Sequence, residues 1–259
     1  MMENRGFGAV LERLLDHRML SAQALADRAG STGDEVRAVL AGKSPSEVML
    51  RLLAPALDFH AVDLFILAGW AVPDDLAPLD ATAAKWSTRI VTDAARLPET
   101  GRRELLQLIR SLPQEERRAG FVLKPPMSLT GGPGAWVVRM LQYRNLNWMG
   151  IAKTLASATP TYLSAATYGV IGSGRQELTP RLVTDFAALL GIDACELAVV
   201  TGVPLRQVPP PPSAEAADVA ELLWEARRLS AVQARHVSEL ARALRGDPTT
   251  GGSSASLGP

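Results

Sequence analysis

Residues capable of catalysis or metal binding are few and widely separated in this chain of 259 residues. His17, His60 and His236 are scattered, and Cys195, the single cysteine, has no second ligand near it in the sequence. We therefore expect no zinc site and no cofactor. The segment GVIGSG, from Gly169, has the glycines of a phosphate-binding loop, but no strand precedes it and no Lys-Ser/Thr pair follows. Because no nucleophile is paired with a base, we expect that the protein is not an enzyme.

Hydrogen-bonding and basic side chains offer a different chemistry in the second half of the chain. Thr159 is suited to cap a helix whose first position is Pro160, where the missing amide hydrogen costs nothing. The exposed start of that helix would carry neutral groups able to bind bases or phosphates, namely Thr161, Tyr162 and Ser164. The surrounding segments contain Lys153, Arg139, Arg144, Arg175 and Arg181. Alternatively, Tyr162 packs on its own domain and the arginines are ordinary solvated charges.

The charge totals limit any nucleic-acid surface to a local patch. Lys+Arg and Asp+Glu are both 27, so no global basic field attracts nucleic acid or an anionic membrane. One cysteine excludes an intrachain disulfide framework, and the start MMENRGFG lacks a basic region followed by an apolar one. The longest apolar stretch, 61–72, contains Asp63 and is too short to span a bilayer. We expect a cytoplasmic protein with no membrane partner.

Apolar residues at helical spacing and the near absence of alternating β-branched runs predict an all-α protein. In the first part of the chain they predict helices at about 7–18, 21–30, 33–41, 46–57 and 61–70. Ser21 is placed to cap the second of these helices, and Gly42 to end the third. The tail from Gly246 has no residues able to build a core, so we expect residues 247–259 to be disordered.

The chain contains an internal duplication that covers nearly its whole length. GFGAVLERLLDHRMLSAQALADRAG aligns with GPGAWVVRMLQYRNLNWMGIAKTLA, which pairs Arg13 with Arg139 and Arg18 with Arg144. ALDFHAVDLFILAG aligns with LLGIDACELAVVTG, which pairs Asp63 with Glu196. The offset grows from 126 to 133, so the second copy has a net insertion of seven residues, which we expect near YGVIGSGRQELTP. A third match pairs RLPETGRRELLQLIRSL with RLSAVQARHVSELARAL.

These matches predict two repeats, 1–127 and 128–246, joined by the Pro- and Gly-rich segment LKPPMSLTGGPG. In repeat one, a five-helix part at 6–73 is followed by a helical segment at 80–118. In repeat two, the corresponding parts are 132–204 and 214–245, and the Pro-rich stretch 208–213 between them is expected to be a stiff polyproline II spacer. A Pro-rich ligand for another domain is an alternative.

Five short helices with a Gly-centred turn between the second and third resemble the XRE (lambda-repressor-like) helix-turn-helix family. The resemblance rests on LSAQALADRAGSTGDEVRAVLAGKSPS and, less closely, on LNWMGIAKTLASATPTYLSAATYG. It implies that the third helix lies in the major groove of DNA, and that the N-terminus of the second helix contacts a phosphate. The family often places Gln directly after the cap of the second helix, but this chain has Ala22 and Trp148 there.

The two repeats differ in their suitability for DNA. The third helix of repeat one begins with Asp34 and Glu35, which suit a capping box with Thr32 but would repel phosphates. Residues 1–73 carry 7 basic and 9 acidic side chains, whereas residues 132–204 carry 5 basic and 4 acidic. We therefore expect DNA contact mainly through repeat two. The candidate DNA-binding residues are Lys153, Thr159, Thr161, Tyr162, Ser164, Arg175, Arg37 and Lys43.

The helical segments at about 83–112 and 216–244 carry long apolar stripes, and each needs a partner to cover that face. Packing against each other would give an intrachain pseudo-dimer, whereas packing between chains would give a true homodimer. The sequence thus predicts a cytoplasmic, nucleoid-associated transcription regulator that binds duplex DNA, with repeat one available to a protein partner. The alternative is a degenerate helix-turn-helix scaffold that binds a protein and not DNA.

Overall fold

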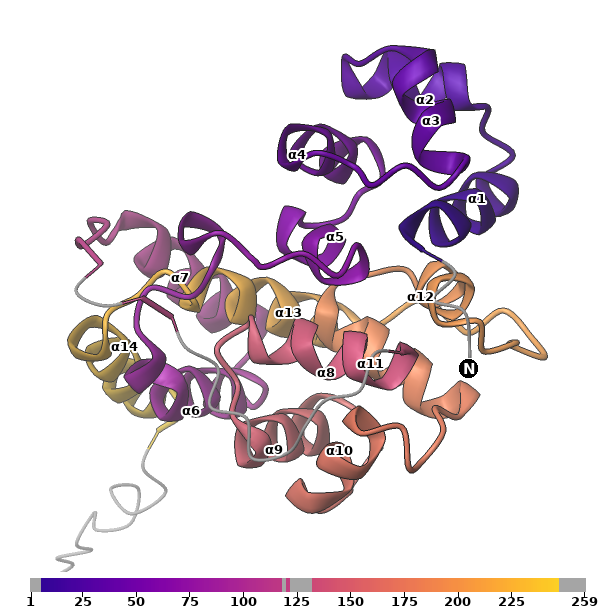
Figure 1. Ribbon diagram of the computed structural model, residues 1–259. Coiled ribbons are helices and arrows are strands. Elements are labelled where there is room, and N and C mark those ends of the chain that lie inside the picture. The colour runs from indigo at the N-terminus through magenta and orange to yellow at the C-terminus, as the bar shows by residue number, and fades with distance from the viewer. Residues whose placement is uncertain (1–5, 118–119, 122–131, 247–259) are drawn as a thin grey trace, which may run out of the picture.

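Every regular element of the described chain is a helix, as the apolar spacing requires (Figure 1). The structure, a computed structural model, describes residues 6–117, 120–121 and 132–246. The all-α prediction is confirmed. The expected tail, 247–259, and most of the Pro- and Gly-rich junction lie outside the described residues. Within them, none of the helices has the length and hydrophobicity needed to span a bilayer.

Two sets of five helices correspond to the two copies of the duplicated sequence. The first set, called unit one, comprises α1 (Phe7–Arg18), α2 (Ala22–Ala29), α3 (Gly33–Leu40), α4 (Glu47–Ala56) and α5 (Ala61–Leu67). The second set, called unit two, comprises α8 (Pro133–Gln142), α9 (Trp148–Ala158), α10 (Ala165–Gly172), α11 (Pro180–Leu190) and α12 (Ala194–Thr201). The five helices predicted in unit one agree with the observed ones, and Ser21 caps α2 by accepting the Ala24 amide at 3.1 Å.

The two units also share details of backbone packing. Met19 and Asn145, at equivalent positions after α1 and α8, both adopt left-handed backbone conformations, with φ of 49° and 62°. At Gly8, an added Cβ would lie 2.4 Å from the carbonyl oxygen of Val39; at Gly134, it would lie 2.3 Å from that of Ile171. In each unit, the first helix therefore approaches the backbone of the third so closely that only glycine fits.

The insertion in unit two does not lie where the sequence suggested. Helix α9 has 11 residues against 8 in α2, and its connection to the next helix is 159–164, where unit one has only 30–32. Six of the seven extra residues are thus in α9 and the α9–α10 connection, and one is between α10 and α11. The predicted insertion near YGVIGSGRQELTP is wrong, since only one of the extra residues lies there and the first five residues of that stretch, 168–172, form the end of α10.

The helical segments that follow the units are two helix pairs and not two long helices. The first pair is α6 (Ala84–Ala94) and α7 (Glu99–Ser111), preceded by the short 3-10 helices η1 (Asp74–Leu76) and η2 (Ala81–Ala83). The second pair is α13 (Ala214–Ala226) and α14 (Ala231–Leu244). Pro98 is the N-cap of α7 and keeps it separate from α6, because the proline ring disfavours a helical conformation at the residue before it. Ser230 and Gln233 form a capping box that begins a new helix in the other.

The helix pairs cover each other's apolar stripes. Helix α6 packs on α14, and the equivalent α13 packs on α7. Their shared core contains buried residues of both pairs, among them Ile90, Leu105, Leu222 and Val237. This arrangement corresponds to the intrachain alternative, in which the duplicated segments imitate the two halves of a dimer.

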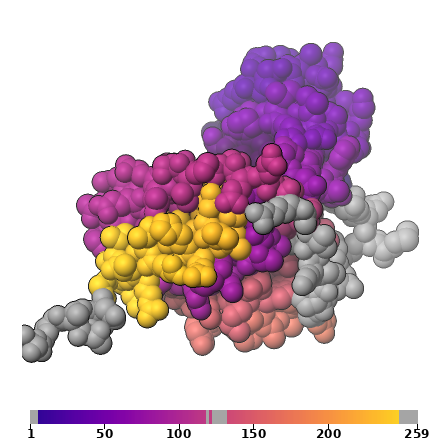
Figure 2. Space-filling model, turned by 90° about the vertical axis from the view of Figure 1, so that its left-hand side faces the viewer, coloured from indigo at the N-terminus to yellow at the C-terminus, as the bar shows by residue number. Residues whose placement is uncertain are grey.

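The two units also pack on each other, with the first helix of each unit against the fifth helix of the other. Helix α1 packs on α12, and the equivalent α8 packs on α5. Unit two also packs on the helix pairs through α9 and α11, and an added Cβ at Gly150 of α9 would lie 2.6 Å from Thr88 Oγ1 of α6. In both views, unit one projects from one end of the remainder, and α9 and α10 lie at the opposite end (Figures 1 and 2).

Candidate nucleic-acid interface

The α9–α10 region of unit two differs from the sequence prediction in where its second helix begins. Thr159 does not cap a helix beginning at Pro160; it is the C-terminal cap of α9, in an extended conformation with φ −139° and ψ 163°. The proline ring disfavours a helical conformation at the residue before it, so Pro160 ends α9 and does not begin α10. The N-cap of α10 is Ser164, whose hydroxyl lies 3.0 Å from the hydroxyl of Thr167.

Two of the predicted contact residues, Thr159 and Thr161, use their hydroxyl groups in hydrogen bonds within this local structure. The Thr159 hydroxyl donates to the Leu155 carbonyl at 2.8 Å and accepts the Thr161 amide at 3.2 Å. Thr161 is buried, and its hydroxyl donates to the Asp185 carboxylate of α11. The prediction that Thr161 belongs to an exposed helix start is therefore wrong. Its role in this structure is to fix the α9–α10 connection to α11.

Other predicted residues are exposed on α9, at the connection that follows it, or near the ends of α10 and α11. Tyr162 is 87% exposed, so the interpretation that it packs on its own domain is wrong. Lys153 is exposed on α9, and Arg175 is exposed after α10, where its Nε donates to Ser173 Oγ at 3.1 Å. Arg181, at the start of α11, donates to the Pro160 carbonyl at 2.8 Å. Tyr162, Ser164 and Arg181 thus lie at the connection between α9 and α10, whereas Lys153 lies within α9 and Arg175 beyond the end of α10.

The sequence of α8, α9 and α10 carries charge of one sign, up to the exposed Glu177 that follows Gln176. Residues 132–176, which include α8, α9 and α10, contain Arg139, Arg144, Lys153 and Arg175 but no Asp or Glu. Arg144 is buried in an ion pair with Asp63 and is not part of this surface, whereas the side chains of Lys153 and Arg175 are exposed. A hollow of about 410 Å³ lies beside the connection, lined by Pro160, Thr161, Tyr162, Leu163, Gln176, Thr179, Arg181 and Leu182. The surface therefore combines positive charge, hydroxyl groups and an exposed aromatic ring.

The equivalent region of unit one has a different character. Thr32 and Glu35 form the capping box predicted from the sequence, with Glu35 Oε2 accepting the Thr32 amide at 3.1 Å. Hydrogen bonds from the amide and hydroxyl of Thr32 lower the pKa of Glu35, so this exposed carboxylate stays charged. Arg37 is paired with Asp34 at 2.6 Å, and Lys43 is exposed beyond the end of α3. The two acids at the start of α3 thus have a structural explanation, and one of them neutralises Arg37.

No protein family, curated protein or solved structure matches this chain. The candidate interface therefore rests on its own geometry. Among the described residues, no group of three or more His, Cys, Asp or Glu side chains could hold a metal ion.

Sequence reasoning missed a second constellation, which joins the two units. Arg144, which follows α8, pairs with Asp63 of α5, and Trp224 of α13 lies beside them, stacked on His60 with 3.4 Å between ring centroids. Arg227 lies 3.6 Å from the Trp224 ring centroid. A signal was present in the sequence, because Arg18 and Arg144, and likewise Asp63 and Glu196, occupy equivalent positions in the two copies.

Proposed function

We propose that this chain is a transcription regulator of the XRE helix-turn-helix type that binds duplex DNA through unit two. The observation that carries the proposal is the acid-free stretch 132–176, which displays Lys153, Arg175, Tyr162 and Ser164 around α9 and α10. Basic side chains supply affinity by neutralising phosphates, and hydroxyl groups hydrogen-bond phosphates or base edges. We infer that α10 and the connection before it face the DNA.

The arrangement of the units favours one DNA contact per chain. A palindromic site is read by two recognition helices about 34 Å apart, on the same side of a dimer. Here α3 and α10 lie at opposite ends of the molecule in both views (Figures 1 and 2). Since α3 also presents Asp34 and Glu35, we infer that unit one does not dock beside unit two. The bound sequence should then lack twofold symmetry.

A second function, a scaffold that binds a protein through unit one, is favoured by the surface of α4. Val48 is 65% exposed and Leu52, one turn further on, is 37% exposed. Apolar side chains at this spacing on one helix are a common feature of protein contacts. In this reading, unit one would hold the partner and DNA would not be bound.

Capture of fragmented genomic DNA by the purified protein at near-physiological salt, followed by sequencing, separates the two functions. DNA binding through unit two predicts enrichment of a few sites that share a motif without twofold symmetry. Recovery no better than that of bare beads would reject DNA binding and favour the scaffold. A Lys153→Glu/Arg175→Glu variant serves as the matched negative control, because both side chains are exposed and lie outside the core.

A further inference from the structure

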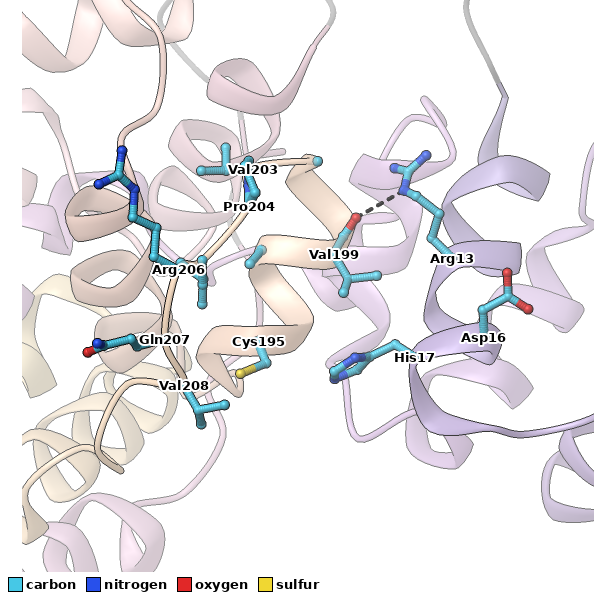
Figure 3. A pocket seen from close by; sticks show the side chains of 13 residues that line it. Arg13, Asp16, His17, Cys195, Val199, Val203, Pro204, Arg206, Gln207 and Val208 are labelled. Carbon is cyan, nitrogen blue, oxygen red and sulfur yellow. Dashed lines mark hydrogen bonds between the residues drawn. The ribbon is translucent and has the colours of Figure 1, made fainter.

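The seam between the two units contains a cavity of about 580 Å³ (Figure 3). Its walls come from α1 of unit one, from α12 of unit two, and from the non-helical segment 202–208 that follows α12. The lining is largely apolar and includes Ala198, Val199, Val203, Pro204, Leu205 and Val208. Val208 is 82% exposed, so an apolar side chain is left open to solvent at this place. The volume is within the range of about 300–1,000 Å³ that is usual for small-molecule sites.

The equivalent seam on the other side of the molecule is occupied by the chain itself. The duplication pairs His17 of α1 with Tyr143, and Tyr143 packs against Phe121 with ring centroids 5.4 Å apart. Continuing the offset of 133 past the second match pairs Gln207 with Asp74, and a Cβ added to Gly120 would lie 3.9 Å from the Asp74 carboxylate. Residues 120–121 thus lie where a ligand of the α1–α12 cavity would lie. In that seam, the group that fits against the first helix is an aromatic ring.

The polar groups of the cavity favour a negatively charged ligand. Arg13 Nε and Nη2 donate to the carbonyl oxygens of Val199 and Val200, both at 3.0 Å. Arg13 Nη1 has no hydrogen-bond partner among the described residues, and a guanidinium donates readily to a carboxylate. The other charged lining residues are Arg206 and Asp16. Figure 3 shows His17 directed from α1 towards α12, one helical turn from Arg13.

We propose that this cavity is a binding site for a small aromatic carboxylate, with its ring between His17 and Val208 and its carboxylate on Arg13. Because α1 belongs to unit one and α12 to unit two, such a ligand would contact both units and stabilise the seam between them. The site does not depend on DNA binding, so its test uses the protein alone.

The single cysteine of the chain, Cys195, lines the cavity and reports on its occupancy. The rate at which iodoacetamide alkylates Cys195 is measured with increasing 1-naphthylacetate, and again with the neutral 1-naphthylacetamide. We expect saturable protection by the carboxylate, with about fivefold more of the amide needed for the same effect, as for one partly exposed ion pair. Absence of saturable protection at millimolar ligand, or equal protection by the amide, would overturn the proposal.

Two variants assign the protection to the proposed contacts, and calorimetric titration of 1-naphthylacetate gives the affinities. Arg13→Gln should bind the carboxylate and the amide equally well, a result that a purely structural role of Arg13 does not produce. Val199→Trp should fill the cavity and abolish binding, whereas the control Val232→Trp, at a 77% exposed position on α14, should bind normally. Undiminished binding by Val199→Trp would overturn the proposal. The proposal would also be overturned if the chain had no affinity for the ligand but self-associated, and Val199→Trp abolished this self-association. The cavity would then hold a second copy of the chain.

Discussion

Arg144 of unit two and Asp63 of unit one form an ion pair from which water is almost entirely excluded, with side chains 1% and 0% exposed. Arg144 Nη2 lies 2.8 Å from Asp63 Oδ2, and the guanidinium also contacts the Leu190 carbonyl. Its equivalent, Arg18, pairs with Glu196 at 2.6 Å and contacts the Leu57 carbonyl, but these two side chains are each 14% exposed. The duplication has therefore placed the same ion pair twice, once in each direction across the seam.

The two ion pairs should differ in their effect on stability. Asp63→Asn leaves the Arg144 charge buried without a counterion, and we expect the free energy of unfolding to fall by about 3–5 kcal/mol. Glu196→Gln leaves Arg18 with Asp58 at 3.2 Å and with access to water, so the loss should be about 1 kcal/mol. Urea denaturation of both variants provides the comparison. Equal losses would show that burial does not distinguish the two pairs.

His60 should make stability depend on pH. Burial lowers the pKa of His60 to about 4, and the charges of Arg144 and Arg227 add to this effect, while Asp63 opposes it. The unfolded chain, with an ordinary His pKa near 6.5, binds a proton more readily than the folded chain between pH 6.5 and 4. The stabilisation is thus complete above pH 6.5 and is lost as the pH falls towards 4, by roughly 3 kcal/mol in total.

The variant His60→Gln should reduce this pH dependence, because it removes the group whose pKa differs between the two states. His236→Gln, on the exposed side of α14, is the matched control and should retain the full dependence. Urea denaturation at pH 4.5, 5.5 and 7 measures both. If His60→Gln left the change of the free energy of unfolding with pH unaltered, the pH dependence would come from other groups.

Gly8 and Gly134 should not tolerate a side chain. A Cβ at either position would lie less than 2.5 Å from a backbone carbonyl oxygen of the third helix of its unit, so Gly8→Ala and Gly134→Ala should each destabilise the protein by about 1–3 kcal/mol. Gly6→Ala is the control, because an added Cβ there has no neighbour within 4 Å. Thermal unfolding of the three variants tests this. A loss as large for Gly6→Ala would indicate a general effect of removing glycine.

Thr161 and Tyr162 are neighbours in sequence with opposite expected roles. Thr161→Val removes a buried hydrogen bond to Asp185 and should lower stability by about 1–2 kcal/mol. Tyr162→Ala, at an 87% exposed position, should leave stability nearly unchanged and weaken DNA binding. Denaturation and DNA titration of both variants separate the roles. Full DNA affinity in Tyr162→Ala would remove this ring from the interface.

The sequence predicted the helices of unit one well because their caps and apolar faces act locally. It failed at the α9–α10 connection, where Thr159 and Pro160 have the residue types of a helix start, but the restriction that proline imposes on Thr159 ended a helix instead. The contact between Thr161 and Asp185 joins residues 24 positions apart, and a helical pattern contains no information on such a pair. The cavity in the seam depends on the relative placement of α1 and α12, which no local pattern specifies.

The salt dependence of binding to duplex DNA tests the central proposal most directly. Each phosphate contact that is lost should reduce the slope of log K against log salt by about 1. We expect Lys153→Ala and Arg175→Ala to weaken binding and reduce this slope, whereas Arg37→Ala and Lys43→Ala, at exposed positions of unit one, should leave it unchanged. Equal slopes for all four variants and the unsubstituted protein would contradict a DNA-binding role of unit two. The absence of measurable binding at 50 mM salt would also contradict it, because phosphate contacts are strongest at low salt.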